Sequence, residues 1–555
     1  MNISAPRSEG VWRSLRAAGL YAVLTVLMTW PMVTRLHVMD AGDSAFFAWE
    51  IGWELHALKT DLRQLPHANI FHPLPYTLGM DEPVFGTTIL ILPLALFTDD
   101  AVWLFNVARL LTFAFSALTA YWLARELDCG EAASLVAGAA FAFSTIVDPL
   151  AHLSTLGTQW LPLVFLFLYR FTRTGAQRDA FLAGLFYVLE TMASGYHGLI
   201  AAVVLPCAAL PLVWGRWRLV ARALPAMLAT ALALVPLYWL HQAALEPHGF
   251  SRGRGEAVVH AASLQTFLAT NAWNRLYGEA TAPFRTEAND LFPGLVRPAL
   301  ILIGAWAAWR ERRRPGRVAL SLAVTIVVSV VVALGPEVRW FDRSLGVGPF
   351  AWLREAVPIF QMIRVTSRVG PFLRLGLALL LARVLVRWAG RPVVVALCAV
   401  LVVGEAVMVP IPMPGWSQVI DTRRPPPAVY TWLAAQPGDF AVVELPIQGA
   451  KVATEKSAYH ESVYMVHSTR HWKRLLNGYS GFEPQRYREL KEKCLRFPDA
   501  ESIAVIRALG AKYVIVHRAG YGPFKAARLE RDLPAFAADL RPVQELGADL
   551  VLELR

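Results

Sequence analysis

About a dozen apolar stretches lie along this chain, and most approach the ~20 residues that a helix needs to cross a bilayer. Of the 555 residues, 55% are hydrophobic and only 17% are charged, and the mean hydropathy is +0.42. A soluble protein of this length has more charge and shorter apolar runs. We therefore predict a polytopic α-helical membrane protein. The candidate spans are residues 15–36, 84–98, 101–124, 132–147, 157–169, 180–194, 199–214, 219–240, 292–309, 318–335, 372–388 and 393–408.

The net charge of +11 follows from membrane topology and does not indicate a nucleic-acid partner. Arginines gather in short loops between apolar stretches, at residues 170–178, 216–222 and 310–317. Short loops rich in Lys and Arg stay on the cytoplasmic side of a membrane. We expect these loops and the arginine-bearing N-terminus to be cytoplasmic, and we expect no nucleic acid to bind.

The segment at residues 84–98 decides the topology. If it crosses the membrane, every later arginine-rich loop falls outside, whereas all of them fall inside if the segment is re-entrant or half-length. The segment is short for a span and follows Pro83, so we favour the second alternative. The prediction is then about 11 to 12 transmembrane helices, with a cytoplasmic N-terminus and an extracytoplasmic C-terminus.

Beyond the spans, the sequence predicts long outer loops and a separate C-terminal domain. The transmembrane domain is expected over residues 1–412, with outer loops at 37–83 and 241–291, and loops of this length usually carry function or structure of their own. A proline-rich linker follows at 413–427, and residues 428–555 are typical of a small α/β domain. Predicted strands are residues 440–445, 513–516 and 550–554, and predicted helices are 486–495 and 502–509.

Asp43, in the first outer loop, is the candidate catalytic residue. A carboxylate held at the boundary of water and lipid can act as a general base on a membrane-embedded substrate. The structural alternative is that Asp43 caps a helix beginning at Ser44, with Asp40 as an Asx-turn residue of the same loop. Capping and catalysis are compatible, because a cap would hold the carboxylate in place.

The helix predicted after Asp43, residues 44–58, has two alternative placements. Phe46, Trp49 and Trp53 recur at helical spacing, with Glu50 and Glu54 on another face. This pattern is typical of an amphipathic helix lying in the membrane interface. The alternative is an ordinary helix packed on the rest of the protein. Either placement anchors Asp43 near the membrane surface.

Asp40 and further polar residues near the spans are candidates for binding the substrate or a lipid phosphate. Glu82 begins an apolar segment, where a helix N-terminus favours negative charge, and it is also a candidate partner of Asp43. Arg109, within a span, must face the bundle interior or a cavity, and His152 lies between two spans. Arg364 and Arg368, four residues apart, can clamp a phosphate or extend to the headgroups.

Several common enzyme classes are excluded. The sequence has no Walker loop, no G-x-G-x-x-G opening a helix, no H-E-x-x-H and no G-x-S-x-G. Its cysteines form no CxxC pair, so neither a disulfide framework nor a zinc site is predicted.

The whole pattern resembles the GT-C superfamily of integral-membrane glycosyltransferases, which includes protein O-mannosyltransferases and lipid A aminoarabinose transferases. The resemblance rests on a first span followed by an acidic outer loop, here Gly42-Asp43-Ser44 leading into Trp49 and Trp53. The segments HPLPYTLGMDEP and AHLSTLGTQWLPL strengthen it. In the C-terminal region, VVELPI, STRHWKRLLNGYSGFEP and AKYVIVH resemble the tail domain of a bacterial branch.

The resemblance implies transfer of a sugar from a polyprenyl-phosphate carrier to a glycan, lipid or protein acceptor, on the outer face of the bacterial cytoplasmic membrane. In this superfamily an acidic residue of the first outer loop serves as the base or orients the acceptor, a role that falls on Asp43. Transfer is typically inverting. Some members need a divalent cation such as Mg or Mn, for which Asp43 and Glu82 are the candidate ligands. Asp40 and Asp43 are separated by two residues, whereas several members have an adjacent acidic pair.

Two other functions compete with transfer. A transporter or flippase of lipid-linked glycans often shows inverted repeats, and the two halves of this sequence show no convincing similarity. A glycan polymerase or ligase has similar topology and would depend on outer-loop arginines rather than on Asp43.

Overall fold

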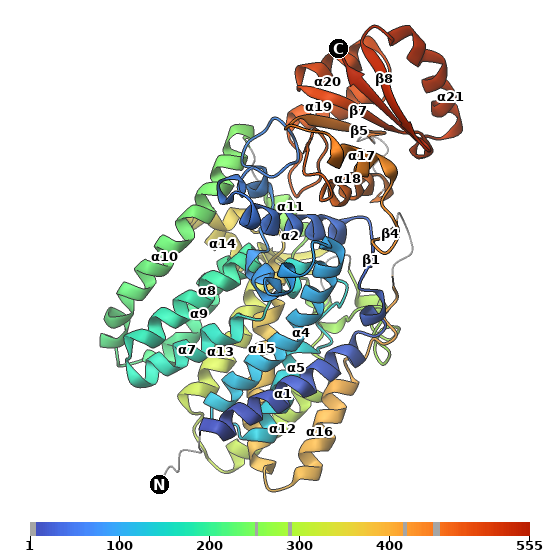
Figure 1. Ribbon diagram of the computed structural model, residues 1–555. Helices are drawn as coiled ribbons and strands as arrows, with labels where there is room; N and C mark the ends of the chain where they lie inside the picture. Colours follow the sequence, from blue (N-terminus) through green and yellow to red (C-terminus); the bar gives the residue numbers. More distant parts are fainter. Residues whose placement is uncertain (1–6, 250–252, 287–290, 414–418, 448–454) are drawn as a thin grey trace. The chain divides into compact units, whose positions relative to one another are not determined.

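A computed structural model describes residues 7–249, 253–286, 291–413, 419–447 and 455–555. Contacts divide the chain into two compact units (Figure 1). The first, called the helical unit, comprises Met1–Thr34, Arg109–Val235 and Ser251–Pro412. The second, called the loop-and-tail unit, comprises Arg35–Ala108, Pro236–Phe250 and Met413–Arg555. Each unit is described by itself.

The helical unit is built from helices that follow the apolar stretches of the sequence. Helices α4 and α10 begin or end in the other unit, because the division falls within them. The helices are α1 (Arg7–Met28), α4 (Ala101–Glu126), α5 (Glu131–Ala142), α6 (Leu153–Leu156), α7 (Leu161–Thr174), α8 (Gln177–Ala193), α9 (Gly195–Val213), α10 (Arg218–Leu245), α11 (Arg254–Val259), α12 (Val296–Arg310), α13 (Arg317–Ala333), α14 (Pro349–Ala356), α15 (Gly370–Leu385) and α16 (Pro392–Gly404). The short strands β2 (Glu337–Trp340) and β3 (Arg343–Val347) form a hairpin.

Most candidate spans coincide with helices, the first needs correction, and residues 84–98 agree with the favoured alternative that they do not cross the membrane as a full span. The stretch predicted at residues 15–36 is helical only as far as Met28, because the chain turns at Pro31 and continues as a short 3-10 helix, Met32–Arg35. Residues 84–98 form no continuous helix but three short turns, α3 (Phe85–Thr88) and the 3-10 segments Ile89–Ile91 and Leu94–Leu96. A segment broken in this way has no single helix long enough to span a bilayer.

Five helices of the described chain are long and apolar enough to cross a membrane. They are Glu9–Met28, Ala101–Glu126, Gly195–Val213, Arg218–His248 and Thr366–Trp388. Shorter apolar helices accompany them at Glu131–Ala142, Arg317–Ala333 and Pro392–Gly404. The chain is therefore a multi-pass membrane protein.

Small residues let the helices of this unit approach closely. A Cβ on Gly138 of α5 would lie 2.3 Å from the hydroxyl of Tyr21 and 2.4 Å from the carbonyl oxygen of Ala117. A Cβ on Gly376 of α15 would lie 2.8 Å from Ile326 of α13. Close backbone approach of this kind stabilises helix pairs in a lipid environment, where apolar side chains gain little from leaving the lipid. Figure 1 shows α7, α8 and α9 side by side in the same unit.

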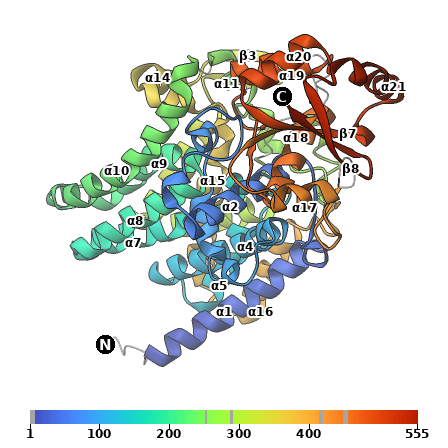
Figure 2. The same ribbon diagram turned by 45° about the horizontal axis from the view of Figure 1, so that its top comes forward.

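The loop-and-tail unit contains a mixed sheet, β6-β5-β7-β9-β8 in spatial order, among its described residues. Strand β5 (Ala441–Leu445) is parallel to β6 (Arg474–Leu475) and β7 (Ala511–His517), whereas β9 (Asp549–Leu554) is antiparallel to β7 and β8 (Leu540–Leu546). Figure 2 shows α19 and α20 on one side of these strands and α17 on the other. The helices here are α2 (Asp43–Lys59), α3, α17 (Ala428–Ala435), α18 (Glu455–Ser468), α19 (Gln485–Cys494), α20 (Ala500–Ala508) and α21 (Pro523–Asp532).

The strands predicted in the tail are confirmed as β5, β7 and β9, and the two predicted helices as α19 and α20. Strand β5 is buried at every position, so its sequence is a continuous apolar run apart from Glu444. Strand β8 was not predicted, because five of its seven residues are exposed and it lies at the edge of the sheet.

Helix α2 packs inside the loop-and-tail unit and is not an amphipathic interfacial helix. Trp49 and Trp53 are buried, and their indole nitrogens donate to the Oδ1 of Asn69 and the carbonyl oxygen of Leu65, both at 3.0 Å. Glu50 and Glu54, predicted on a polar face, are fully buried as well. A helix covered on all sides has no face left for lipid headgroups, so the packed alternative is correct.

Candidate functional site

The candidate residues fall into two groups, one in each unit. One cavity of the helical unit is lined by His152, Arg364 and Arg368. The charge of Arg109 stabilises the carboxylate of Asp148, which also lines that cavity. Asp40, Asp43 and Glu82 belong to the loop-and-tail unit.

The cavity of the helical unit has a volume of about 480 Å³ and a strongly cationic lining. Arg364, Arg368 and Arg374 all contribute to it, and two histidines, His152 and His260, join them. The remaining polar residues of the lining are Thr145, Asp148, Thr155, Asn271, Thr286 and Ser367. Guanidinium groups that converge on one cavity are suited to binding phosphate or carboxylate.

The arginines are held in place by aromatic rings and hydroxyls. The guanidinium carbon of Arg368 lies 4.2 Å from the centre of the Tyr196 ring, and that of Arg374 lies 4.7 Å from the centre of the Phe141 ring. Arg374 also donates to the Oγ1 of Thr158 at 2.9 Å, while its Nε has no hydrogen-bond partner among the described residues although the side chain is buried. A buried donor without a partner is costly, so Arg374 has capacity for an anionic ligand.

Asp148 places one negative charge in this cationic lining. Its Oδ1 accepts from the backbone N–H of Leu150 at 2.8 Å, which fixes the turn that follows α5. Burial raises the pKa of Asp148, and the charge of Arg109 and a hydrogen bond with Asn271 act in the opposite direction. Arg109 is buried in α4, so the prediction that it faces the bundle interior or a cavity is confirmed. Its charge stabilises a carboxylate of the cavity.

The wall of the cavity at Thr145 is anchored by hydrogen bonds from three other segments. The Oγ1 of Thr145 donates to the carbonyl oxygen of Phe292 at 2.5 Å, and Thr270 donates to the carbonyl oxygen of Thr145 at 2.7 Å. Arg297 of α12 donates to the Oγ1 of Thr145 at 3.1 Å. These bonds hold the end of α5, and with it Asp148, in a defined position.

Asp43 is the first residue of α2, and its N-cap is Gly42, not Asp43 itself. The capping alternative is therefore wrong: Gly42 has a φ of 109°, a conformation that favours glycine, and the helix begins one residue earlier than predicted. The Oδ1 of Asp43 accepts a hydrogen bond of 2.6 Å from the hydroxyl of Tyr479 in the tail. The carboxylate thus lies in the first turn of a helix, where the N-terminal end of the dipole favours negative charge.

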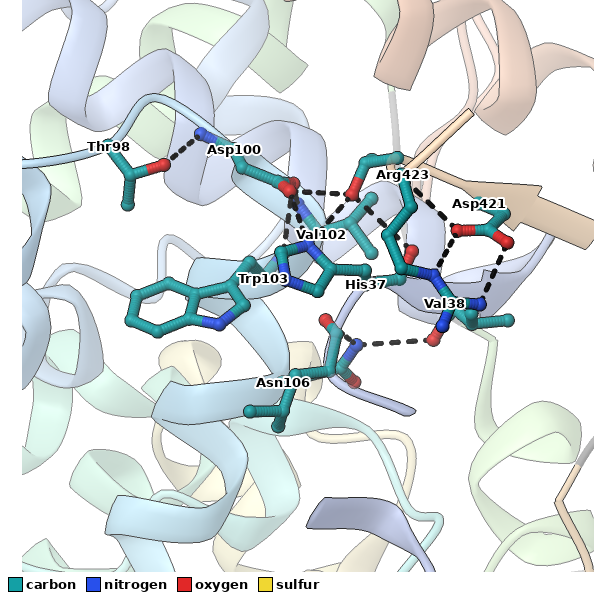
Figure 3. Close-up of polar contacts among 11 residues, drawn as sticks. His37, Val38, Thr98, Asp100, Val102, Trp103, Asn106, Asp421 and Arg423 are labelled. Carbon is teal, nitrogen blue, oxygen red and sulfur yellow. Dashed lines mark hydrogen bonds and ion pairs between the residues drawn. The ribbon is translucent and has the colours of Figure 1, made fainter. Parts of the chain in front are cut away.

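Asp40 lies in strand β1 (Val38–Asp40), which pairs with β4 (Val419–Asp421) and places Asp40 opposite Val419. Figure 3 shows the contacts beside this pair. The Nδ1 of His37 lies 2.9 Å from the Oδ2 of Asp100, and Asn106 donates to the carbonyl oxygen of Val38 at 3.2 Å. Asp100 also accepts from the backbone N–H groups of Val102 and Trp103, which caps α4.

Glu82 belongs to a group of carboxylates around α2. Burial, together with the charges of Glu54, Asp81 and Glu82, raises the pKa of Glu50. Burial also raises the pKa of Glu54 to about 8, against hydrogen bonds that lower it. In the part of the chain that the structure describes, no three His, Cys, Asp or Glu side chains are placed to hold a metal ion together. That Asp43 and Glu82 bind a divalent cation stays a prediction.

The sequence did not single out Asp148, His260, Asn271 or Arg374, although all of them line the cavity. Arg374 lies six residues beyond Arg368, inside the stretch predicted as a span, and a charged residue inside a span is itself a signal that would have indicated it. Asp148, a charged residue at the end of an apolar stretch, is a similar signal. His260 and Asn271 come from a polar loop and carry no such signal.

A protein-family model with the description "Domain of unknown function (DUF6311)" matches residues 86–404, which is more than half of the chain. The chain belongs to this family. The DUF6311 match covers most of the helical unit, including every described residue of the cavity, and leaves out Asp43. No curated protein is similar enough in sequence to count as a relative.

The fold of this chain is similar to that of several solved structures. The arabinofuranosyltransferase AftD from Mycobacteria matches 99% of this chain, with a TM-score of 0.59 and 15% identity, and this chain spans 40% of the length of AftD. A second similar structure is the archaeal oligosaccharyltransferase AglB from Archaeoglobus fulgidus, in complex with an inhibitory peptide and a dolichol-phosphate. The match covers 96% of this chain and 73% of the AglB chain, with a TM-score of 0.50 and 13% identity. Both are GT-C glycosyltransferases, so the fold expected from the resemblance is confirmed.

Proposed function

We propose that the chain transfers a sugar from a polyprenyl-phosphate carrier to an acceptor on the outer face of the bacterial cytoplasmic membrane. The GT-C fold supports this proposal, because AftD and AglB are named as glycosyltransferases. The activity itself rests on the chemistry of the cavity. A glycan, lipid or protein hydroxyl would serve as the acceptor.

The observation that carries the proposal is the convergence of Arg364, Arg368 and Arg374 on one cavity of a membrane protein. A polyprenyl-phosphate sugar is a phosphodiester with one negative charge. When the sugar leaves, the carrier becomes a phosphomonoester, and its negative charge increases. Fixed guanidinium groups therefore stabilise the transition state more than the bound donor, and this difference accelerates the reaction.

The position of the cavity along the chain fits an amphipathic donor. Arg368 and Arg374 lie in a segment, Thr366–Trp388, that is long and apolar enough to cross a membrane. They lie in the half of this segment that begins at Thr366, so the charges that line the cavity are nearer to this end of the apolar helix. A lipid phosphate can bind at such an end while its hydrocarbon chain stays in the bilayer.

In the proposed reaction, an acceptor oxygen forms a bond to the anomeric carbon as the bond from that carbon to the phosphate oxygen breaks. The acceptor proton passes to a carboxylate, and polyprenyl phosphate leaves. This single displacement inverts the anomeric configuration. We assign the proton to Asp43, and we assign Asp148 to hydrogen bonding in the cavity.

The experiment uses the full chain in lipid vesicles, with farnesyl-phosphate arabinofuranose, mannose and glucose as synthetic donors. The expected product is farnesyl phosphate, released together with glycosylated acceptor from a membrane extract. Asp43→Asn is expected to lower the turnover about 10²- to 10⁴-fold while donor binding is retained. Asp148→Asn is the comparison, because it removes a carboxylate charge from the cavity itself.

The outcomes separate the competing functions. Movement of an intact donor across the membrane without release of farnesyl phosphate would indicate a flippase. Turnover only with a lipid-linked oligosaccharide would indicate a polymerase or ligase. Full activity of Asp43→Asn together with loss of activity in Asp148→Asn would transfer the role of base to Asp148. Lipids of a deletion strain provide a second check, since the unused polyprenyl-phosphate sugar should accumulate.

A further inference from the structure

Tyr479 of the tail contacts Asp43 of the first loop, although 436 residues separate them. The phenol hydroxyl donates to the Oδ1 of Asp43 at 2.6 Å, a short distance typical of a hydrogen bond to an ionised acceptor. The ring of Tyr479 meets the ring of Phe46 edge-on, with centres 6.0 Å apart and planes at 75°. Phe46 is one helical turn after Asp43, so α2 itself orients the ring whose hydroxyl binds its first residue.

The start of α2 is held by a second contact from the tail. The backbone N–H of Gly42 donates to the Oγ of Ser462 at 2.9 Å, and Ser462 is buried in α18. Because Gly42 is the N-cap of α2, this bond sets where the helix begins. The backbone and the carboxylate of the Gly42-Asp43 pair are therefore both held by tail residues.

The segment that bears Tyr479 is rigidly supported on its N-terminal side. The side chain of Asn477 is buried, accepts from the backbone N–H of Glu444 at 2.8 Å and donates to the carbonyl oxygen of Glu444 at 2.9 Å. It also donates to the Oε2 of Glu461 at 3.0 Å. An amide that satisfies three bonds in a buried site has one allowed orientation. Asn477 thus ties the segment to strand β5 and helix α18.

The same segment is tied to the first loop on both sides of Tyr479. The backbone N–H of Phe71 donates to the carbonyl oxygen of Asn477 at 2.9 Å. On the other side, the backbone N–H of Gly481 donates to the Oδ2 of Asp81 at 2.7 Å. The residues two positions before and two positions after Tyr479 are therefore both bound to the loop that carries Asp43.

Gly478 allows this close approach. A Cβ at position 478 would lie 2.5 to 2.8 Å from three ring atoms of Phe71, closer than real Cβ atoms come to their neighbours. The two segments are in contact at the backbone of Gly478, and any side chain there would separate them.

We propose that Tyr479 is a positioning residue for Asp43, and that the tail domain is an integral part of the candidate catalytic centre. This inference rests on the proposed role of Asp43. The hydroxyl holds the carboxylate in one orientation and favours its ionised form, which is the form that accepts a proton. Residues of the tail thereby set the protonation and the direction of a carboxylate in the first loop.

The test is Tyr479→Phe in the full chain, assayed with the farnesyl-phosphate donor that supports the highest wild-type turnover. We expect kcat to fall about tenfold, with the KM for the donor within about twofold of wild type, because one hydrogen bond to a charged group is lost. The acid limb of the pH–rate profile should move to higher pH, since the ionised carboxylate has lost a donor. Tyr513→Phe is the matched control: its ring packs against Trp432 and Phe440 elsewhere in the tail.

A double variant distinguishes positioning from a general effect on folding. If Tyr479 acts through Asp43, then Tyr479→Phe should cost nothing further in an Asp43→Asn background. Additive losses, or an unchanged acid limb in Tyr479→Phe, would overturn the inference and leave the proposed function intact. Full activity of Asp43→Asn would instead overturn the role proposed for Asp43.

A fluorinated tyrosine at position 479 covers the case in which Tyr479→Phe does not fold. 3-Fluorotyrosine keeps the shape of the residue and has a more acidic hydroxyl, which is a stronger donor. The acid limb should then move to lower pH, opposite to the change in Tyr479→Phe. No movement would overturn the positioning role.

Discussion

Arg297 of α12 and Glu405 at the end of α16 form an ion pair that is excluded from solvent, with 3.5 Å between Nε and Oε1. The other carboxylate oxygen of Glu405 accepts from the backbone N–H groups of Leu295 and Val296, both at 3.0 Å, and so caps α12. Arg297 reaches on to Thr145 in the wall of the cavity. The pair therefore joins three helices and positions one side of the candidate site.

Breaking this pair should destabilise the protein strongly. Arg297→Met leaves the carboxylate of Glu405 buried without its cation, and we expect a loss of about 3–5 kcal/mol in the free energy of unfolding. Adding Glu405→Gln removes the unpaired buried charge and keeps an acceptor for the N-terminal N–H groups of α12. The double variant should therefore recover about 1–3 kcal/mol of the free energy of unfolding. Denaturant unfolding of the detergent-solubilised chain measures both. A double variant less stable than Arg297→Met alone would contradict the role of the ion pair.

The arginines of the cavity should control donor use. Arg368→Gln and Arg374→Gln each remove a charge from the lining, and we expect kcat/KM for the farnesyl-phosphate donor to fall about 10- to 150-fold. Arg383→Gln is the control, because Arg383 lies on the same helix but donates to the carbonyl oxygen of Leu127 at 2.8 Å and does not line the cavity. Equal losses in all three variants would indicate a general effect on folding.

Stability should fall as the pH rises, owing to Glu54. Burial raises the pKa of Glu54 in the folded state to about 8, from an ordinary value of 4.5. Between these values the folded protein holds a proton that the unfolded chain has released, so the contribution of Glu54 is complete below pH 4.5 and is lost as the pH approaches 8. We expect Glu54→Gln to reduce the decrease in melting temperature between pH 5 and pH 8. Glu483→Gln, which removes a partly exposed partner of Lys491, should leave this decrease unchanged.

A side chain at position 478 should separate the tail from the first loop. Gly478→Ala places a Cβ against the ring of Phe71, and we expect a loss of about 1–3 kcal/mol in stability, as for other overpacked sites. Combining it with Phe71→Leu removes the ring that is in the way and should recover part of the loss. Gly522→Ala is the control, because a Cβ there meets nothing within 4 Å. Thermal unfolding of the three variants provides the measurement, and equal effects at 478 and 522 would contradict the close approach.

The sequence allowed part of the candidate site to be predicted. His152, Arg364 and Arg368 were chosen because charged or polar side chains beside apolar segments are costly and rarely without function, and the structure brings them to one cavity. His260 and Asn271 come from a loop whose composition gives no such indication. Nothing local distinguishes a polar loop residue that faces a cavity from one that faces solvent.

The helix after Asp43 shows the limit of hydrophobic periodicity. Trp49 and Trp53 indicated one apolar face, and Glu50 and Glu54 suggested that the other face was exposed to solvent. In the structure both glutamates are buried, because α18, α3 and other segments of the loop-and-tail unit pack around α2. Periodicity reports the average polarity of a face, whereas the energy of burying a carboxylate depends on partners supplied by distant segments, such as the hydroxyl of Thr88 that donates to Glu54.

By itself, the sequence determined that the chain is a multi-pass membrane protein and where most of its helices and tail strands lie, because length, hydropathy and side-chain period are local properties of a segment. The tertiary structure alone decided that Asp43 accepts a hydrogen bond from Tyr479, that Asp148 and Arg374 share a cavity with Arg368, and that Arg297 pairs with Glu405. Each of these contacts joins residues far apart in the chain. Their free energy arises only when folding brings the partners together and removes water from between them, and no local pattern records which partner that will be.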